Sequence, residues 1–374
     1  METKTLFTRI LILSGLFIHL GFKASAIADG QSIPTDNPLS NRLDSLVDAS
    51  VKTYFSNGNA VALSIGVVKK GKTYFYNYGA IDNQKLPDKK TIYELGSMTK
   101  TFTGILLAQA VLDKKIKLND DVRKYLKEPY PNLEFKGIPV RIVDLSNHTS
   151  RITRIFPNLY ERGAYVDANP YSNYSKEMLY QGLHNMTMDT LPGKIHSYSN
   201  MAVGLLGCIL EDVYEQGYFT LISKFILKPL KMGDTKIDLS QEKAARIARA
   251  HNEKKEVVPF WDLPDLPAIG ALRSNTSDLV KYIYANNSEA RPAISLSHQL
   301  TFGTNQEGVA LNWFIHTSSN GYKVLEHGGG TGGSRSSLQC FPQLNSGFVL
   351  LTNSLANRNQ LEKDLASILT EQTK

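Results

Sequence analysis

The sequence predicts an α+β fold in which both ends of the chain contribute to one antiparallel sheet and a mainly helical region is inserted between them. Runs rich in β-branched and aromatic residues occur near the start, at 60–80, and again near the end, at 308–353. Helical spacing and polar loops dominate about 97–304. Because neither end has enough strands for a stable sheet alone, we expect sheet parts at about 38–96 and 305–374 to pair.

The first residues have the pattern of an export signal. Lys4 and Arg9 precede the apolar run 10–22, and the small residues of "KASA" follow at the spacing that signal peptidases read. This run of 13 residues is too short for a membrane span, which takes about 20 apolar residues, and no other segment is long enough. We therefore expect a signal peptide at 1–26, a mature chain at 27–374, and a periplasmic or extracellular location.

The other elements follow in order along the mature chain. Apolar residues at helical spacing predict an amphipathic helix within 38–55, and the runs 60–68 and 72–80 flank "KKG" as the strands of an antiparallel hairpin do. Apolar helical patterns also occupy 200–217 in the inserted region. The segment 359–372 predicts a closing helix.

Composition limits the classes of partner. The formal net charge of +7 falls to +5 when the predicted signal peptide, with three basic residues and one acidic residue, is removed. The chain has no Lys/Arg run and no alternation of aromatic and basic residues, so we expect no nucleic-acid partner. It also lacks metal-ligand spacings and a phosphate-loop context, so we expect no metal and no cofactor. Cys208 and Cys340 lie in separate apolar stretches, which favours two buried thiols, while export leaves a disulfide open.

Two Ser-x-x-Lys pairs occur, Ser97 with Lys100 and Ser240 with Lys243, and on a helix each pair lies on one face. Ser240 precedes a polar, alanine-rich segment, so we expect its hydroxyl to cap a first helical turn. Ser97 follows Gly96 after the extended stretch "TIYEL" and opens an apolar helix. Burial would disfavour the ammonium form of Lys100, which could then accept the serine proton, and the Ser97 N–H could face an oxyanion. The other interpretation is a capping serine beside a solvated lysine.

The stretch "YELGSMTK" resembles the first motif of the class C β-lactamase and penicillin-binding serine hydrolase family, in which two further motifs follow Ser-x-x-Lys. The similarity covers most of the mature chain and includes, in the family's order, "ALSIGVVKKGKTYFYNYG", "IKLNDDVRKYL", "NHTS", "ILKPLKMGDT", "IGALRSNTSDL" and "EHGGGTGG". It implies a β-lactamase/DD-peptidase-like catalytic domain at 27–374, an acyl-enzyme on Ser97, and a small-molecule or cell-wall peptide substrate. We expect a monomer.

The second motif of this family is Tyr-x-Asn. The chain has four such triplets, which begin at Tyr130, Tyr171, Tyr198 and Tyr284. Tyr198 alone follows "LPGKIHS" and precedes a long apolar helix, as the family's second motif does, while Tyr171 lies in a polar loop and stays an alternative. The resemblance implies that Tyr198 shares the Ser97 proton with Lys100, as a phenolate stabilised by the ammonium group. It also implies that Asn200 hydrogen-bonds the substrate amide.

The third motif departs from the Lys-Thr-Gly of class C lactamases, because His327 stands where the lysine would be. By family position the N–H of Gly330 is the second oxyanion donor. A mostly neutral histidine binds a carboxylate less well than lysine does, and it could be catalytic or simply end a strand. Arg335 follows a glycine turn, so we expect it on the neighbouring strand. There it binds the substrate carboxylate, or else it points to solvent or makes a surface ion pair.

The segment "NHTSRI" resembles a family loop that usually continues His-Thr-Ser-Gly. We expect His148 to brace this loop rather than contact the substrate. Arg151 stands where the family has glycine, so a positive φ at this position would strain the arginine and alter the loop beside the cleft.

Together these features predict an exported serine hydrolase that acts on an amide or ester carbonyl of the β-lactam or D-alanyl peptide type. A His-x-Gly third motif recurs in family members that act as DD-peptidases, D-amino-acid peptidases or esterases, so an esterase for small esters is one alternative. A penicillin-binding receptor that is acylated without turnover is another. The deacylation rate separates the receptor from the enzymes.

Overall fold

Both ends of the chain meet in one antiparallel sheet in the computed structural model, which describes residues 32–56, 58–81, 84–161, 165–242 and 244–371. The strand order is β2-β1-β12-β11-β10-β9-β8-β7. These strands are β1 (Ala62–Lys69), β2 (Lys72–Gly79), β7 (Phe302–Gly303), β8 (Glu307–Val309), β9 (Phe314–Thr317), β10 (Lys323–Gly330), β11 (Arg335–Phe341) and β12 (Ser346–Thr352). Because β1 pairs with β12, the two ends share the sheet and the predicted α+β architecture is confirmed.

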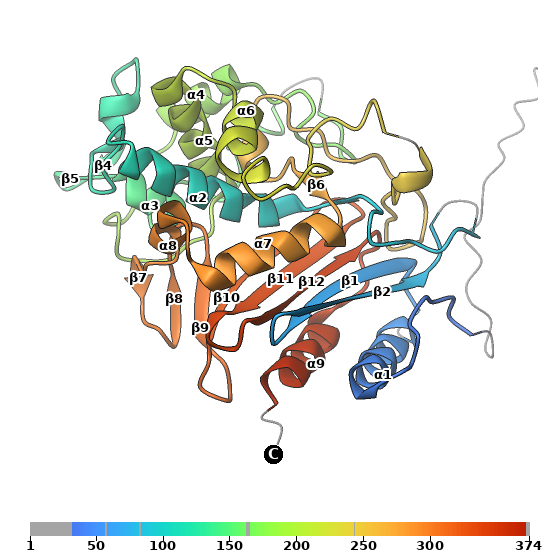
Figure 1. Cartoon of the computed structure of the whole chain (residues 1–374). Helices are drawn as coiled ribbons and strands as arrows, with labels where there is room; N and C mark the ends of the chain where they lie inside the picture. Colours follow the sequence, from blue (N-terminus) through green and yellow to red (C-terminus); the bar gives the residue numbers. More distant parts are fainter. Residues whose placement is uncertain (1–31, 57, 82–83, 162–164, 243, 372–374) are drawn as a thin grey trace, which may run out of the picture.

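Helices cover both faces of this sheet. They are α1 (Arg42–Ser56), α2 (Thr99–Leu112), α3 (Ile142–Ser146), α4 (Lys176–His184), α5 (Asn200–Tyr214), α6 (Tyr218–Ile222), α7 (Thr276–Ser288), α8 (Pro292–Ser297) and α9 (Asn359–Thr370). The short helical turns are η2 (Gly96–Met98), η3 (Val122–Tyr125), η4 (Ser223–Leu227), η5 (Ala244–Arg246), η6 (Pro267–Ile269) and η7 (Pro342–Leu344). Helices α1 and α9 lie on one face, and α7 with the inserted helical region lies on the other (Figure 1).

Two pairs of short strands and the β1–β2 hairpin complete the topology. Strand β3 (Tyr93–Glu94) pairs with β6 (Arg273–Ser274), and β4 (Glu134–Phe135) pairs with β5 (Ile138–Pro139). The β1–β2 hairpin turns through Lys70 and Gly71, whose φ angles are 49° and 76°. Positive φ at both positions is what a two-residue turn of the I′ type requires, so the predicted hairpin is confirmed.

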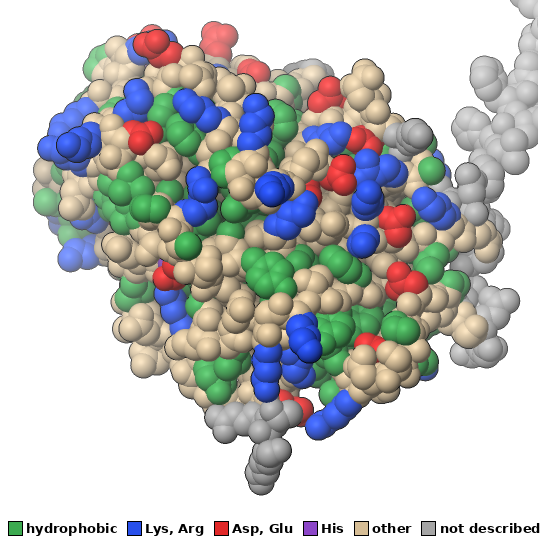
Figure 2. Space-filling model, in the orientation of Figure 1, with side chains coloured by type: hydrophobic (Ala, Val, Ile, Leu, Met, Phe, Trp, Pro, Cys, Tyr) green, Lys and Arg blue, Asp and Glu red, His purple; other side chains and the backbone are tan. Residues whose placement is uncertain are grey.

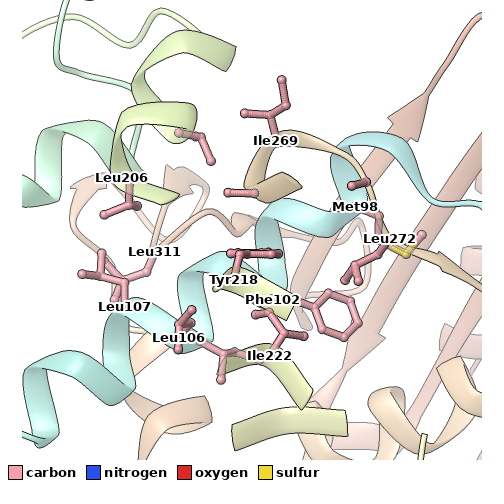
Figure 3. Close-up of a cluster of buried hydrophobic side chains, with 14 of the residues drawn as sticks. Met98, Phe102, Leu106, Leu107, Leu206, Tyr218, Ile222, Ile269, Leu272 and Leu311 are labelled. Carbon is pink, nitrogen blue, oxygen red and sulfur yellow. The ribbon is translucent and has the colours of Figure 1, made fainter. Parts of the chain in front are cut away.

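Successive side chains of each strand point to opposite faces of the sheet. Because helices cover both faces, both sets of side chains are buried. In β12, Phe348 packs in the core with α1 and α9, whereas the next residue, Val349, packs with the helical region. Helix α2 is buried nearly all round, and Figure 3 shows Phe102 and Leu106 of this helix in one cluster with Tyr218 and with Ile269 of η6. This packing holds η6 against the start of α2, directly after the turn η2 that contains Ser97.

Two sequence predictions have definite structural outcomes. Ser240 caps no helix, because its hydroxyl donates to Asp238 Oδ2 at 2.8 Å while its N–H bonds Asp238 Oδ1 at 2.8 Å. This local Asp turn takes the place of the expected helical start. Cys208 and Cys340 are both buried and free, as expected, and burial raises the pKa of the Cys208 thiol to about 12.

The described residues include no candidate membrane span, because no helix among them is long and apolar enough to cross a membrane. The predicted signal peptide lies outside the described residues. On the face shown in Figure 2, Lys and Arg side chains are scattered among acidic and apolar ones.

Candidate active site

Ser97 and Lys100 lie in contact at the start of α2. Ser97 is the middle residue of η2, so it precedes the α-helix that it was expected to open. Lys100 is fully buried, its Nζ lies 3.0 Å from Ser97 Oγ, and the carbonyl of Ile269 accepts a hydrogen bond from it at 2.6 Å. Burial lowers the Lys100 pKa well below its ordinary value, and the nearby Arg154 guanidinium lowers it further. The solvated-lysine interpretation is therefore wrong.

Gly96 brings this turn against the edge of the sheet. Its φ is 52°, and a Cβ on it would lie 2.8 Å from Gly330 N, so the two backbones meet only because Gly96 has no side chain. Gly330 therefore lies directly beside Ser97, as the resemblance implied.

The N–H of Gly330 is free to face the cleft. In an antiparallel pair, residues that exchange hydrogen bonds alternate with residues that do not. Thr331 N donates to Ser334 O at 3.0 Å, so the preceding pair, Gly330 opposite Arg335, directs its N–H and C=O groups away from β11. On the other side of β10, pairing with β9 reaches only Glu326. This geometry suits an oxyanion donor.

A buried carboxylate, Glu94, ties these two parts together. It accepts hydrogen bonds from Thr331 Oγ1 at 2.7 Å, from Ser334 Oγ at 3.0 Å and from the N–H of Trp261 at 2.8 Å. Burial raises the pKa of the Glu94 carboxyl, and the hydrogen bonds from these donors offset only part of this effect. Glu94 is three residues before Ser97 and was missed by the sequence analysis, although an acidic residue inside the apolar stretch "TIYEL" was a signal.

Tyr198 lies above the Ser97–Lys100 pair. Ser199 caps α5 by accepting from Ala202 N at 2.9 Å, which fixes the preceding Tyr198 at the helix entrance. The ring centroid of Tyr198 is 5.2 Å from Lys100 Nζ. Its hydroxyl is buried without a hydrogen-bond partner in the described chain, and burial raises its pKa to about 12, although nearby Ser97 partly offsets this. The resting geometry thus favours the phenol, in contrast to the expected phenolate.

Both Tyr-Ser-Asn triplets contribute to one cleft. Asn200, the first residue of α5, has a buried Oδ1 with no partner among the described residues. Tyr171 also lines the cleft and packs against Trp261, with ring centroids 5.5 Å apart. Burial raises the Tyr171 pKa and the adjacent Asn200 side chain partly offsets this. Tyr171 does lie in a loop, as expected, but its ring is buried against the aromatic wall.

His327 is a buried, neutral imidazole in this cleft. Its Nδ1 lies 2.6 Å from the Gly328 carbonyl, which only accepts, so Nδ1 carries the hydrogen and Nε2 is an acceptor. That Nε2 is buried without a partner in the described chain. Burial and the Lys100 charge lower the His327 pKa to about 3. His327 therefore cannot replace the missing lysine as a cation.

Three arginines line the cleft of about 720 Å³, and no Asp or Glu is among its described lining residues. Arg335 is half-buried and donates from Nη1 to the carbonyls of Thr331 at 2.9 Å and Ser334 at 3.1 Å. It makes no surface ion pair with a described residue, so that alternative is wrong. Arg154 and Arg358 were missed by the sequence analysis, because neither lies in a motif. Arg358 contacts Glu362 at 2.6 Å.

The loop "NHTSRI" is braced as expected. His148 Nδ1 accepts from Ser199 N at 3.3 Å, and the His148 carbonyl accepts from Ser197 N at 2.7 Å. Arg151 does adopt a positive φ, 64°, and its guanidinium pairs with Asp189 at 3.2 Å. The glycine-like backbone of this loop is thus retained with an arginine in place.

Comparisons with known proteins identify the family of the chain. The sequence profile of the Beta-lactamase family matches residues 43–371. Protein flp of Staphylococcus aureus (strain MRSA252) is 26% identical over 332 residues, which are 84% of this chain and 64% of that protein. The chain thus spans somewhat less than two thirds of this relative.

Solved structures show the same fold at low sequence identity. A class C beta-lactamase superposes with a TM-score of 0.76 at 22% identity, covering 89% of this chain and 97% of that one. A beta-lactamase/D-alanine carboxypeptidase from Yersinia pestis, complexed with citrate, superposes with a TM-score of 0.75 at 20% identity, covering 87% and 97%.

Proposed function

The chain belongs to the β-lactamase family, and we propose that it is a serine hydrolase that forms an acyl-enzyme on Ser97 with an anionic β-lactam or D-alanyl peptide. The observation that carries this proposal is the contact of 3.0 Å between the fully buried Lys100 Nζ and Ser97 Oγ. A neutral amine in this position can take the serine proton as Oγ attacks the carbonyl carbon.

The proton then passes to the leaving group. Oγ of Ser97 forms a bond to the carbonyl carbon, and its proton moves to Lys100 Nζ. When the carbon–nitrogen bond breaks, the Tyr198 hydroxyl gives its proton to the leaving nitrogen, and the new ammonium of Lys100 reprotonates the phenolate. Because burial raises the pKa of Tyr198 to about 12, its hydroxyl keeps its proton at neutral pH until the strongly basic leaving nitrogen takes it.

Backbone donors and side chains would hold the substrate. The N–H groups of Ser97 and Gly330 stabilise the oxyanion of the tetrahedral intermediate. The partnerless Oδ1 of Asn200 accepts from the substrate amide N–H on the acyl side. The cations Arg335 and Arg358 supply the carboxylate recognition that neutral His327 lacks.

The time course of intact mass with benzylpenicillin tests this proposal against its alternatives. Transient mass addition with release of penicilloate supports turnover of a β-lactam. A permanent adduct supports the penicillin-binding receptor. No adduct and no hydrolysis, with turnover of a neutral nitrophenyl ester, supports the esterase. Cleavage of a D-alanyl-D-alanine peptide without lactam loss supports a peptidase.

The pH profile should report the perturbed Lys100. Because burial disfavours its ammonium form, acylation should rise with pH and reach a plateau well below the ordinary lysine pKa of 10.5. His327, with a pKa of about 3, should add no limb between pH values of about 5 and 9. Single-turnover acylation rates check both points. A limb that persists to the ordinary lysine range would show that Lys100 is not the base.

Arg335→Ala should weaken reaction with carboxylate-bearing substrates by about 1.5 to 3 kcal/mol, the range for hydrogen bonds to charged groups. Its Nη1 is used by the turn carbonyls, which leaves Nε and Nη2 for a substrate. Comparison of kcat/KM for a penicillin or D-alanyl peptide with that for a neutral nitrophenyl ester checks this. Equal losses on both would show that Arg335 only supports the turn.

We also propose export, from the basic, apolar and small-residue pattern of residues 1–26. Sequencing of the N-terminus of the protein isolated from its cells should begin at Ile27, in the periplasmic or extracellular fraction. Recovery of a chain that starts at Met1 would contradict this.

The monomeric state expected from the sequence stays a prediction, which light scattering of the mature protein can check.

A further inference from the structure

Arg154 is a cation in the cleft, and no neighbour among the described residues neutralises its charge. Its guanidinium Cζ lies 5.2 Å from the ring centroid of Tyr198, the same distance as Lys100 Nζ. It is exposed and forms no ion pair with any residue that the structure describes. Because no Asp or Glu is among the described residues that line the cleft, the site itself offers Arg154 no anion.

The backbone of Arg154 is fixed to the start of α5. Its carbonyl accepts from Asn200 N at 3.0 Å, and the Thr153 carbonyl accepts from Ser199 Oγ at 2.7 Å. These bonds anchor the arginine beside the residue that we assign to the acyl amide of the substrate. Arg154 therefore stands on the acyl side of the reacting carbonyl.

The other two arginines approach from the sheet. A Cβ on Gly330 would lie 2.8 Å from Arg335 Nη1, and a Cβ on Gly328 would lie 2.7 Å from Arg358 Nη2, so both guanidinium groups lie against β10. Arg154 belongs to the helical region and lies over Tyr198. The cleft thus has cations on two different walls, with Ser97 between β10 and Tyr198.

We propose that Arg154 forms an anion subsite for the acyl group, so that the preferred substrates carry a carboxylate on the acyl side in addition to the carboxylate of the leaving group. An acyl group of the succinyl or glutamyl type has this chemistry. Arginine suits the task because its planar group binds a carboxylate through two parallel N–H donors. This inference rests on the proposed function, since it assumes that Ser97 is acylated.

Two thioesters with the same leaving group test the subsite. Succinyl-glycyl-thioglycolate and butyryl-glycyl-thioglycolate differ in a terminal carboxylate or methyl group on the acyl side. The wild-type protein should show a kcat/KM about tenfold or more higher for the succinyl compound, as expected for one charge-assisted pair. Arg154→Gln should bring this ratio of kcat/KM values close to one. Arg291 is an exposed arginine outside the cleft, so the control variant Arg291→Gln should leave the ratio unchanged.

The ratio must be measured on the pH plateau, because Arg154 also lowers the pKa of Lys100 and of Tyr198. If Arg154 acts only on these two groups, its replacement should slow hydrolysis of both thioesters equally and leave the ratio of their kcat/KM values unchanged. That result would overturn the proposal, as would a wild-type ratio of one.

Binding without turnover separates this inference from the proposed function. Calorimetry on the Ser97→Ala protein should show tighter binding of succinyl-glycine than of butyryl-glycine, and the added Arg154→Gln change should remove the difference. If wild-type Ser97 is never acylated but this difference is found, the proposed function fails and the anion subsite stands. If no difference in binding is found, the subsite is wrong whatever the enzyme hydrolyses.

Discussion

Ser97→Ala is expected to abolish covalent labelling by a serine-directed fluorophosphonate. The reagent needs an alkoxide-like oxygen, and Ser97 Oγ is the hydroxyl that contacts a buried lysine whose pKa is lowered. The change removes one hydrogen-bonding atom from a half-exposed side chain, so the fold should persist. Gel fluorescence and intact mass measure the label, and circular dichroism checks that the variant is folded.

Ser240→Ala is the matched control for this experiment. Ser240 also has a lysine three residues later in the sequence, but its hydroxyl donates to the Asp238 carboxylate on the exposed surface. A carboxylate acceptor on a solvated turn gives no activated oxygen. Labelling should therefore be unchanged in Ser240→Ala, and persistent labelling of Ser97→Ala would remove the basis of the whole site assignment.

The fold was predictable because its strands and helices have strong local patterns. The β1–β2 hairpin follows from two β-rich runs around a Lys-Lys-Gly turn, and its Gly71 needs the positive φ that it adopts. The pairing of β1 with β12 was inferable only from the need of each end for more strands. Local signals failed at Ser240, where an Asp two residues earlier favours a turn over a helix start.

Motif residues of the site were predictable, while the residues that tune it were not. Ser97, Lys100 and Gly330 meet where the spacing and the resemblance placed them. Arg154 and Arg358 reach the cleft from loops between elements, so only tertiary packing brings them there. Sequence also gives no measure of desolvation, which is why the protonated state of Tyr198 became apparent only from its burial, and why the expected neutral state of His327 gained a firm cause only there.

Tyr198→Phe is expected to lower amide turnover by about 10²- to 10⁴-fold, the range for the loss of a general acid or base. The Tyr198 hydroxyl has no hydrogen-bond partner in the described chain, so its removal leaves no buried polar group unsatisfied. The ring, which contacts His148 with centroids 4.3 Å apart, stays in place. Thermal unfolding should therefore be close to wild type while kcat falls.

The size of this loss should depend on the leaving group. An amine must receive a proton as the carbon–nitrogen bond breaks, whereas a nitrophenolate leaves without one, so Tyr198→Phe should slow acylation by a D-alanyl peptide far more than by a nitrophenyl ester. Tyr171→Phe is the control, since Tyr171 lines the same cleft but adjoins Asn200, and it should slow both substrates little. Equal slowing of peptide and ester in Tyr198→Phe would mean that Tyr198 positions Ser97 instead of donating the proton. A large loss of peptide turnover alone in Tyr171→Phe would transfer the acid role to Tyr171. The reason is that only removal of the group that protonates the leaving amine produces a rate loss that depends on the leaving group.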